Sequence, residues 1–414
     1  MKAGIIAEYS ILIGWVTSAI LVVSFLPGSV YSVAIFSFGA VIAASLLIAW
    51  AAEASESSIS RGLALAIVAI VQTIPEYFVE GTIAWKAGQD PVVWLPNVVA
   101  NFTGANRLLT GLGWPLILFT LIIQRKRRGV VGPTTIALGR GHSVEVVFMI
   151  GGSLYYVWIL VERALTLIDS IILTGIFVAY MWMLAKMPRG MEEAGQALEG
   201  APLAIVQIRS PRRRFLLIVF LFAFSGMTFY LISGPFVESI RQIAEMFLVG
   251  LLGSGAVFFS IQWIAPVLSE FPEKVTAFNW ARQIRLAPMA LLNFISSAVN
   301  ELTALVALIP ILFITSKGSL GVIPLDGQQW IEVFLTMAQS LYACITLLDL
   351  EYDISNAMVL FSLWLISTAL IEARLVVSII FLLLAAIELV GKRRRIVVFS
   401  AFRRTVGQMR QGSS

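Results

Sequence analysis

The stretch VQTIPEYFVEG, residues 71–81, places a proline and two glutamates inside an otherwise apolar segment of the chain. A second stretch, LSEFPEKVTAF at residues 268–278, repeats the arrangement with Pro272 and Glu273. A proline removes one backbone donor from a helix and frees carbonyl oxygens of the preceding turn. Inside a membrane those oxygens need partners, and a carboxylate there is costly. The two stretches therefore predict two interrupted helices whose broken ends face protein, water or an ion.

The composition is that of a membrane protein. Of the 414 residues, 59% are hydrophobic and 13% are charged, whereas soluble domains carry about 25% charged residues. Apolar runs longer than about 18 residues recur along the chain, which predicts an all-α polytopic membrane protein. One cysteine, Cys344, and one histidine, His142, argue against a Cys/His metal centre and against histidine-based catalysis. We expect an integral protein of a prokaryotic-type plasma (inner) membrane.

The apolar runs predict about twelve transmembrane helices. We expect residues 91–124 to form one long kinked span, and residues 244–283 to form one span interrupted at Pro266 and Pro272. The first run carries no signal-peptide cleavage pattern, so we interpret it as a retained helix. The spans are expected near 11–27, 32–54, 61–86, 91–124, 144–162, 165–186, 215–233, 244–283, 287–315, 329–349, 352–371 and 374–391.

Three basic clusters predict the orientation of these spans. They lie at residues 125–129, 209–214 and 391–395. Loops rich in Lys and Arg remain in the cytoplasm. With twelve spans all three clusters fall on the cytoplasmic side, and so do the N-terminus and the C-terminus. The net charge of +5 is therefore attributed to topology and gives no indication of nucleic-acid binding.

The two proline stretches belong to an internal repeat. Pro75 and Pro272 lie in helices that are predicted to run in opposite directions, which is typical of inverted repeats in transporters. Each break is followed by a partner helix that contains Asn, then small residues, then Asn again. The predicted organisation is an extra N-terminal helix at 1–31, a first five-helix repeat at 32–186 with its motif at 71–117, a cytoplasmic loop at 187–214, a second repeat at 215–371 with its motif at 266–312, and an extra C-terminal helix with a basic tail at 372–414.

The two breaks are expected to meet near the middle of the bilayer and to line a cavity rich in oxygen atoms. Hard cations such as Ca²⁺ and Na⁺ favour carboxylate, hydroxyl, amide and carbonyl oxygens. We predict Glu76 and Glu273 as paired ligands, and Glu80 either as a further functional carboxylate or as the partner of a basic residue. The other candidate ligands are Thr73, Asn101, Asn106, Ser269, Glu270, Asn293, Ser296, Ser297, Asn300 and Glu301.

These motifs resemble those of the cation/calcium antiporter superfamily, which includes the sodium/calcium exchangers. That family carries a G-T-S-L-P-E-like break in each inverted repeat, followed by a partner helix with G-N-x-x-G-S-N. Here the first repeat has QTIPE at 72–76 and NFTGANRLL at 101–109, and the second has SEFPE at 269–273 and NFISSAVNE at 293–301. The resemblance implies ten core helices and a secondary antiporter that exchanges Ca²⁺ for Na⁺ or H⁺ by alternating access.

Carried over by position, the resemblance implies that Glu76 and Glu273 are the two central cation-binding glutamates. It also implies that Ser297 and Glu301 are ligands of the second repeat, and that Thr73 and Ser269 take the places of the family's residues near the break.

The sequence departs from the family pattern at four positions. Ala105 and Leu109 stand where the first repeat should offer ligands, and Glu270 replaces a serine. Arg107 adds a positive charge. It would either act as a tethered cation in a sodium subsite or form a structural pair with Glu80.

Other functions remain open at this level. The same fold could carry Mg²⁺, an organic cation or a proton-coupled substrate, or it could have lost transport and act as a receptor or scaffold. A lipid-processing enzyme is disfavoured because the candidate acids pair across repeats inside the spans. We expect no enzymatic activity, no cofactor other than the transported Ca²⁺, Na⁺ or H⁺, and no nucleic-acid partner. Inorganic cations and the lipid bilayer are the expected partners, and protein partners are left open.

Overall fold

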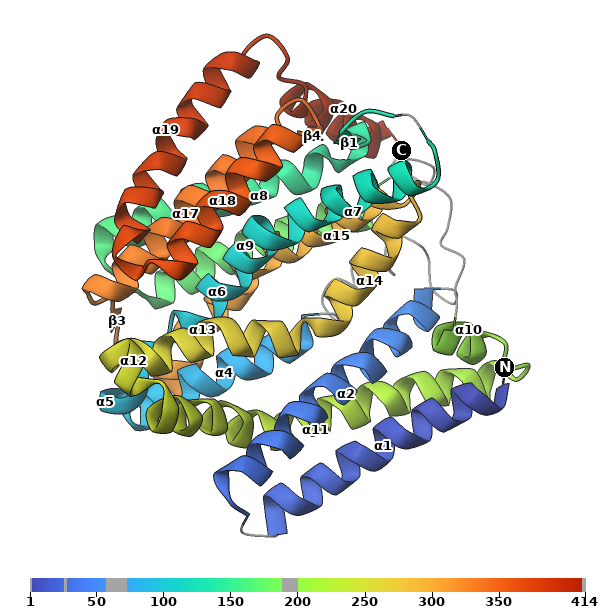
Figure 1. The fold of residues 1–414 in the computed structure, drawn as a ribbon, viewed down its shortest axis with the longest axis vertical. Helices are drawn as coiled ribbons and strands as arrows, with labels where there is room; N and C mark the ends of the chain where they lie inside the picture. The colour runs from blue at the N-terminus through green and yellow to red at the C-terminus, as the bar shows by residue number, and fades with distance from the viewer. Residues whose placement is uncertain (1, 26–27, 57–72, 131, 188–199, 412–414) are drawn as a thin grey trace.

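The computed structural model describes residues 2–25, 28–56, 73–130, 132–187 and 200–411, and they are mostly helical (Figure 1). Within these residues, seven helical segments are long and apolar enough to cross a membrane. A helix satisfies its own backbone hydrogen bonds, as the hydrocarbon interior requires. The seven segments are Val30–Ser55, Pro91–Arg127, Arg140–Glu162, Leu167–Ala185, Pro211–Phe247, Ala287–Lys317 and Ile371–Lys392.

The helices of the first half end at Ala185. They are α1 (Lys2–Phe25), α2 (Val30–Glu56), α4 (Ile74–Gln89), α5 (Pro91–Trp94), α6 (Ala100–Leu108), α7 (Trp114–Arg127), α8 (Ser143–Glu162) and α9 (Leu167–Ala185). Residues 91–127 form a single span, as predicted, which is built from α5, α6, α7 and short irregular turns between them.

The helices of the second half begin at Gly200. They are α10 (Gly200–Val206), α11 (Pro211–Phe247), α12 (Val249–Leu252), α13 (Ala256–Ser269), α14 (Phe271–Arg282), α15 (Ala287–Asn300), α16 (Val306–Lys317), α17 (Gly327–Thr346), α18 (Ile354–Ala369), α19 (Arg374–Lys392) and α20 (Val398–Gln411). Two short antiparallel pairs join connecting segments: β1 (Thr135–Ala137) with β4 (Glu351–Asp353), and β2 (Ala164–Leu165) with β3 (Ile323–Pro324).

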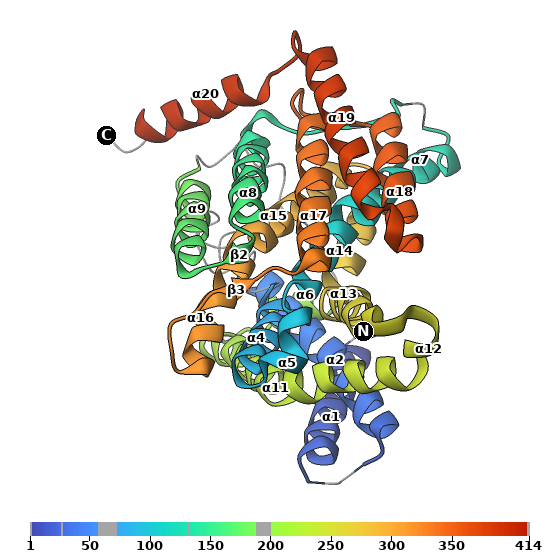
Figure 2. The ribbon, with the colours of Figure 1, turned by 90° about the vertical axis from the view of Figure 1, so that its left-hand side faces the viewer.

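The helices form two groups around a central region. Helices α1, α2 and α11 pack together on one side, and α17, α18 and α19 lie on the other (Figures 1 and 2). Between them lie α4, α6, α13 and α15, which carry most of the predicted site residues.

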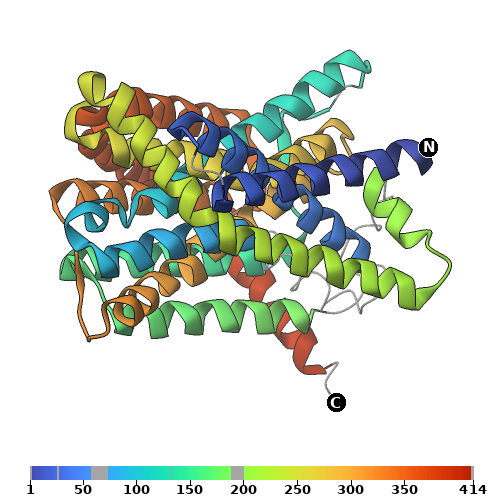
Figure 3. The same ribbon diagram turned by 90° about the horizontal axis from the view of Figure 1, so that it is seen from below.

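The prediction that a span ends near residue 233 is wrong, because α11 continues through Pro235 to Phe247 (Figure 3). The charged residues of its last turns pair with one another and with Lys86 of α4. Arg241 pairs with Glu238 and Glu245, three and four residues away on the same helix face. Packing against α2 and α4 supports the helix beside the proline.

Both prolines of the repeated motif lie in the first turn of a helix. Thr73 precedes α4, which carries Pro75, and Glu270 precedes α14, which carries Pro272. Proline is well tolerated there because the first amide groups have no partner within the helix. On the second repeat, α13 ends at Ser269, so one helix stops and another begins at the motif. On the first repeat, residues 57–72 lie outside the described residues.

The two partner helices share a rare feature at equivalent positions. A π-helical turn follows α6 at Leu109–Gly113, and another follows α15 at Glu301–Leu305. Both turns are five residues long and begin 192 residues apart (301 − 109 = 192). The same offset relates Asn101 to Asn293. Because π-helical turns are uncommon and often mark functional sites, this match supports the internal repeat.

Helix α6 crosses α13 at Gly104 with no room for a side chain. A Cβ atom there would lie 1.8 Å from the backbone oxygen of Gln262. We expect Gly104→Ala to lower the free energy of unfolding by about 1–3 kcal/mol, since the backbones must separate. The measurement is the thermal melting point in detergent. Gly151→Ala is the control, because a Cβ at Gly151 meets nothing within 4 Å. Equal melting points for the two variants would contradict this prediction.

Candidate cation site

Four carboxylates converge at the two helix breaks. Glu76 lies in the first turn of α4, Glu270 immediately precedes α14, Glu273 lies in the first turn of α14, and Glu301 begins the π-helical turn after α15. Glu76, Glu270 and Glu301 each place one oxygen within 4.8 Å of the others. All four residues are buried, none more than 5% exposed. The structure therefore brings together acids that are far apart in the sequence.

The helix starts favour negative charge at this place. The first amide groups of a helix carry partial positive charge and stabilise a nearby anion. Glu76 and Glu273 are acidic residues in the first turns of α4 and α14. The proline that opens each of these helices thus also places its glutamate where a carboxylate is tolerated.

Hydrogen bonds occupy only part of the carboxylate oxygens. Asn293 donates to Oε1 of Glu273 at 2.8 Å, and the Ser297 hydroxyl donates to the same oxygen. Oε2 of Glu273 and both oxygens of Glu76 and Glu301 have no hydrogen-bond partner among the described residues, and neither does Oε1 of Glu270. Within the described residues, six carboxylate oxygens of these four clustered glutamates thus lack hydrogen bonds. Buried anionic oxygens without partners are unfavourable unless protons or cations bind them.

The first repeat uses its asparagine differently from the second. Asn101 donates to Oε2 of Glu80 at 3.0 Å, and the Phe102 amide donates to the same oxygen at 3.1 Å. Glu80 therefore holds the start of α6 and has no basic partner in the described part of the chain. Since Asn101 binds Glu80, it leaves Glu76 without the amide contact that Asn293 gives to Glu273.

The remaining predicted ligands have protein partners. Asn106 accepts from the Ser340 hydroxyl at 2.5 Å and donates to the Ala298 carbonyl at 3.5 Å. These contacts connect α6 with α17 and α15, so Asn106 positions helices of the site.

The other side chains near the cluster are also engaged. Tyr77 donates to the Asn300 side chain at 2.5 Å, and the Ser296 and Tyr180 hydroxyls lie 2.9 Å apart. The Ser269 hydroxyl returns to the Ala265 carbonyl of its own helix, and Thr73 is buried at the start of α4.

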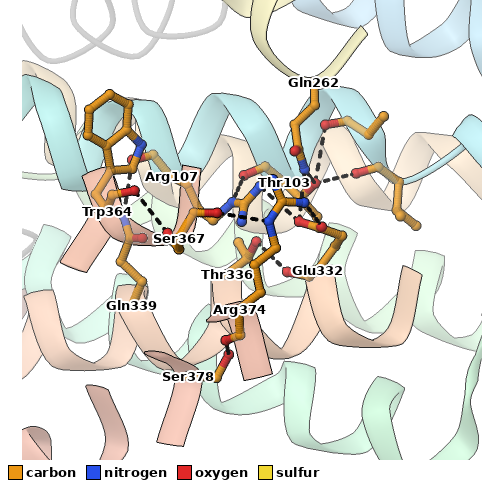
Figure 4. A network of polar contacts seen from close by, with 12 residues as sticks. Thr103, Arg107, Gln262, Glu332, Thr336, Gln339, Trp364, Ser367, Arg374 and Ser378 are labelled. Carbon is orange, nitrogen blue, oxygen red and sulfur yellow. Dashed lines mark hydrogen bonds and ion pairs between the residues drawn. The ribbon is translucent and has the colours of Figure 1, made fainter. Parts of the chain in front are cut away.

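Both expectations for Arg107 require correction. Its guanidinium pairs with Glu332 of α17, with Nη2 2.8 Å from Oε2 (Figure 4). Within the described residues it forms no ion pair with Glu80 or with the four clustered acids. Consecutive helix residues point about 100° apart. Asn106 therefore faces α15 and α17 near the site, while Arg107 lies between α13 and α17, over the Trp263 ring and beside Glu332.

The basic residue that does lie at the site is Lys274, which sequence reasoning missed. Its ammonium forms an ion pair with Oε2 of Glu270. The signal was present, because Glu270 and Lys274 are four residues apart across the start of a helix. Glu332 and Arg374, also missed, were visible only as charges at the ends of apolar runs.

Two comparisons find known proteins that are similar to this chain. The family model described as sodium/calcium exchanger protein matches residues 9–186. A solved crystal structure described as an H⁺/Ca²⁺ exchanger, CAX, is 32% identical, covers 98% of each chain and superposes with a TM-score of 0.87.

More distant structures share the fold alone. The sodium–calcium exchanger NCX_Mj, from crystals soaked with 2.5 mM Na⁺ and 10 mM Sr²⁺, is 14% identical with a TM-score of 0.52. The match covers 82% of this chain and 98% of that one. A search of curated proteins found no match.

Proposed function

Because this chain belongs to the cation/calcium antiporter superfamily, we propose that it is a secondary active antiporter that carries Ca²⁺ in exchange for H⁺. Na⁺ is the alternative coupling ion. The proposal rests on the six oxygens of the four clustered carboxylates that have no hydrogen-bond partner in the described part of the chain. Ca²⁺ takes six to eight oxygen ligands, mostly from carboxylates and carbonyls, so this donor set suits it.

The proposed ligands are Glu76, Glu270, Glu273 and Glu301. Ser297 and Asn293 orient Glu273 through their hydrogen bonds to one of its oxygens, which leaves the other for the cation. The amide and hydroxyl therefore fix the direction of the carboxylate before the ion arrives. This pre-arrangement lowers the ordering cost of binding.

Exchange follows from competition for the same oxygens. In the proposed cycle Ca²⁺ binds the carboxylates from one side, and the protein then exposes the site to the other side. After Ca²⁺ leaves, protons neutralise the carboxylates, and the protein returns. Four close acids cannot remain buried without compensating charge, so each change of exposure takes place with either Ca²⁺ or protons bound.

H⁺ is favoured over Na⁺ as the coupling ion by the first repeat. The 192-residue offset makes Ala105 and Leu109 of the first repeat equivalent to Ser297 and Glu301 of the second repeat. Both are fully buried and offer no side-chain oxygen. A site with these two positions apolar has fewer ligands for a set of Na⁺ ions, whereas protons need only the carboxylates. The solved relative described as an H⁺/Ca²⁺ exchanger supports the same choice.

The proposal includes the membrane arrangement that the sequence predicts. Twelve spans, two inverted repeats at 32–186 and 215–371, and cytoplasmic termini place the basic clusters on one side of a prokaryotic-type inner membrane. The matching π-helical turns support the pairing of the two repeats.

The test is uptake of ⁴⁵Ca²⁺ into proteoliposomes under an imposed H⁺ or Na⁺ gradient. We expect uptake with the H⁺ gradient, and loss of that uptake in Glu273→Gln. Glu372→Gln, which changes an exposed carboxylate outside the cluster, is the matched control and should transport normally. Uptake driven by the Na⁺ gradient alone would show that Na⁺, and not H⁺, is the coupling ion. No uptake with either gradient would refute Ca²⁺ antiport.

A further inference from the structure

The cation site contains a positive charge of its own. The Lys274 ammonium pairs with Glu270, whose side chain is 1% exposed, whereas the Lys274 side chain is 15% exposed. The lysine therefore lies at the edge of the acidic cluster and reaches inward. Its charge also acts on Glu76, Glu273 and Glu301, so it influences every carboxylate of the cluster.

The ammonium occupies an oxygen that would otherwise be available to an ion. Of the two Glu270 oxygens, Oε2 is paired with Lys274, whereas Oε1 has no hydrogen-bond partner among the residues that the structure describes. An ammonium and a monovalent metal ion carry the same charge, and both bind carboxylate oxygens. With Lys274 in place, four carboxylates and one ammonium give the site a net charge of −3 when the acids are ionised, instead of −4.

A second observation concerns the first repeat. Ala105 and Leu109 are fully buried and apolar at positions equivalent to Ser297 and Glu301. The first repeat therefore gives the site fewer oxygen ligands, and the second repeat supplies a fixed cation, the Lys274 ammonium. Both features reduce the number of free ions that can bind at the same time.

From this arrangement we propose that Lys274 determines ion specificity by occupying a monovalent-cation position beside Glu270, which excludes Na⁺ from the site. The inference rests on the proposed function, since it concerns the same carboxylates. It makes Lys274 a built-in counter-ion, so the wild-type protein binds one divalent ion without a sodium ion next to it.

Removing the lysine charge should have two linked effects on Ca²⁺ binding. In Na⁺-free buffer, Lys274→Met frees an oxygen of Glu270 and removes a repulsive charge, so Ca²⁺ should bind about tenfold more tightly. Added Na⁺ should then take the vacated position and weaken Ca²⁺ binding again. If that position binds Na⁺ with a Kd of about 25 mM, then about 100 mM Na⁺ should weaken Ca²⁺ binding roughly fivefold.

The experiment measures equilibrium ⁴⁵Ca²⁺ binding to the purified full chain in detergent, with Na⁺ or choline as the added cation. The wild type and Lys274→Arg, which keeps the charge, are each expected to bind Ca²⁺ with the same affinity in Na⁺ as in choline. Lys274→Met and Lys274→Gln are expected to show the tighter, Na⁺-sensitive binding. Gel filtration checks that each variant is folded, and two neutral substitutions guard against failure of one of them.

The possible results separate this inference from the proposed function. Ca²⁺ binding by Lys274→Met that is unchanged and insensitive to Na⁺ would overturn the role of Lys274 while leaving Ca²⁺ transport intact. If Na⁺ weakens Ca²⁺ binding to the wild type as strongly as it does in Lys274→Met, the role of Lys274 is overturned as well. Absence of Ca²⁺ binding to the wild type would instead refute the proposed function.

Discussion

Glu76→Gln is expected to abolish gradient-driven Ca²⁺ uptake and to weaken Ca²⁺ binding by at least about 100-fold. Both Glu76 oxygens are buried and without hydrogen bonds among the described residues, and one lies within 4.8 Å of oxygens from Glu270 and Glu301. Two opposite unit charges about 4 Å apart attract each other by about 4 kcal/mol at an effective dielectric constant of about 20. Loss of that attraction corresponds to roughly a thousandfold loss of affinity for the cation. Glutamine removes that charge and turns an NH₂ group toward the ion.

The matched control is Glu80→Gln, one turn further along the same buried helix. Glu80 accepts hydrogen bonds from Asn101 and from the Phe102 amide, so its change should loosen the start of α6 and leave Ca²⁺ binding largely intact. Equilibrium ⁴⁵Ca²⁺ binding and liposome uptake measure both variants. Loss of binding in Glu80→Gln together with normal binding in Glu76→Gln would place the ion one helix turn away from the proposed site.

The acidic cluster was predictable because its signal is local and occurs twice. Proline followed by glutamate inside an apolar run is unfavourable unless the break has a partner. Finding the pattern in both halves identified Glu76 and Glu273, and the following Asn-rich helices led to Asn293, Ser297 and Glu301. Only the meeting of Glu270 with Glu76 and Glu301 required the folded chain.

The partners of the charged residues were not predictable in the same way. The sequence offers Glu80 and the acidic cluster as partners for Arg107, because these are the acids near it in the motif. Its actual partner, Glu332, is separated by more than two hundred residues and lies on a helix outside both motifs. What each face of α6 meets depends on where α13 and α17 pack, and no local pattern specifies that packing.

The end of α11 shows a similar limit. Pro235 and the charged residues after it resemble the end of a span, yet Arg241 pairs with Glu238 and Glu245 along one helix face, and Lys86 of α4 pairs with Glu238. The i, i+3 and i, i+4 spacing of Arg241 and the two glutamates was visible in the sequence. What was missing is the support from α2 and α4, which allows the helix to continue past the proline.

Glu332→Gln is expected to lower the stability of the chain more than Gly104→Ala does. One oxygen of Glu332 faces Arg374, and the other lies 2.8 Å from Arg107 and 3.0 Å from the Gln262 amide (Figure 4). The side chains of all three charged residues are no more than 2% exposed. Breaking such a buried pair costs about 3–5 kcal/mol, since the remaining charge has no compensation. Here two guanidinium groups would be left together.

The melting point in detergent tests this, with Glu245→Gln as the control because that carboxylate is 45% exposed and pairs with Arg241 on the surface. An exposed pair contributes about 0–1 kcal/mol, so the control should melt near the wild type.

The double variant Glu332→Gln/Arg107→Gln should recover part of the loss of stability, because it removes one of the two uncompensated charges. No recovery would mean that the packing of Arg107 over Trp263 matters more than its charge. A stable Glu332→Gln would mean that the two arginines are compensated without the carboxylate.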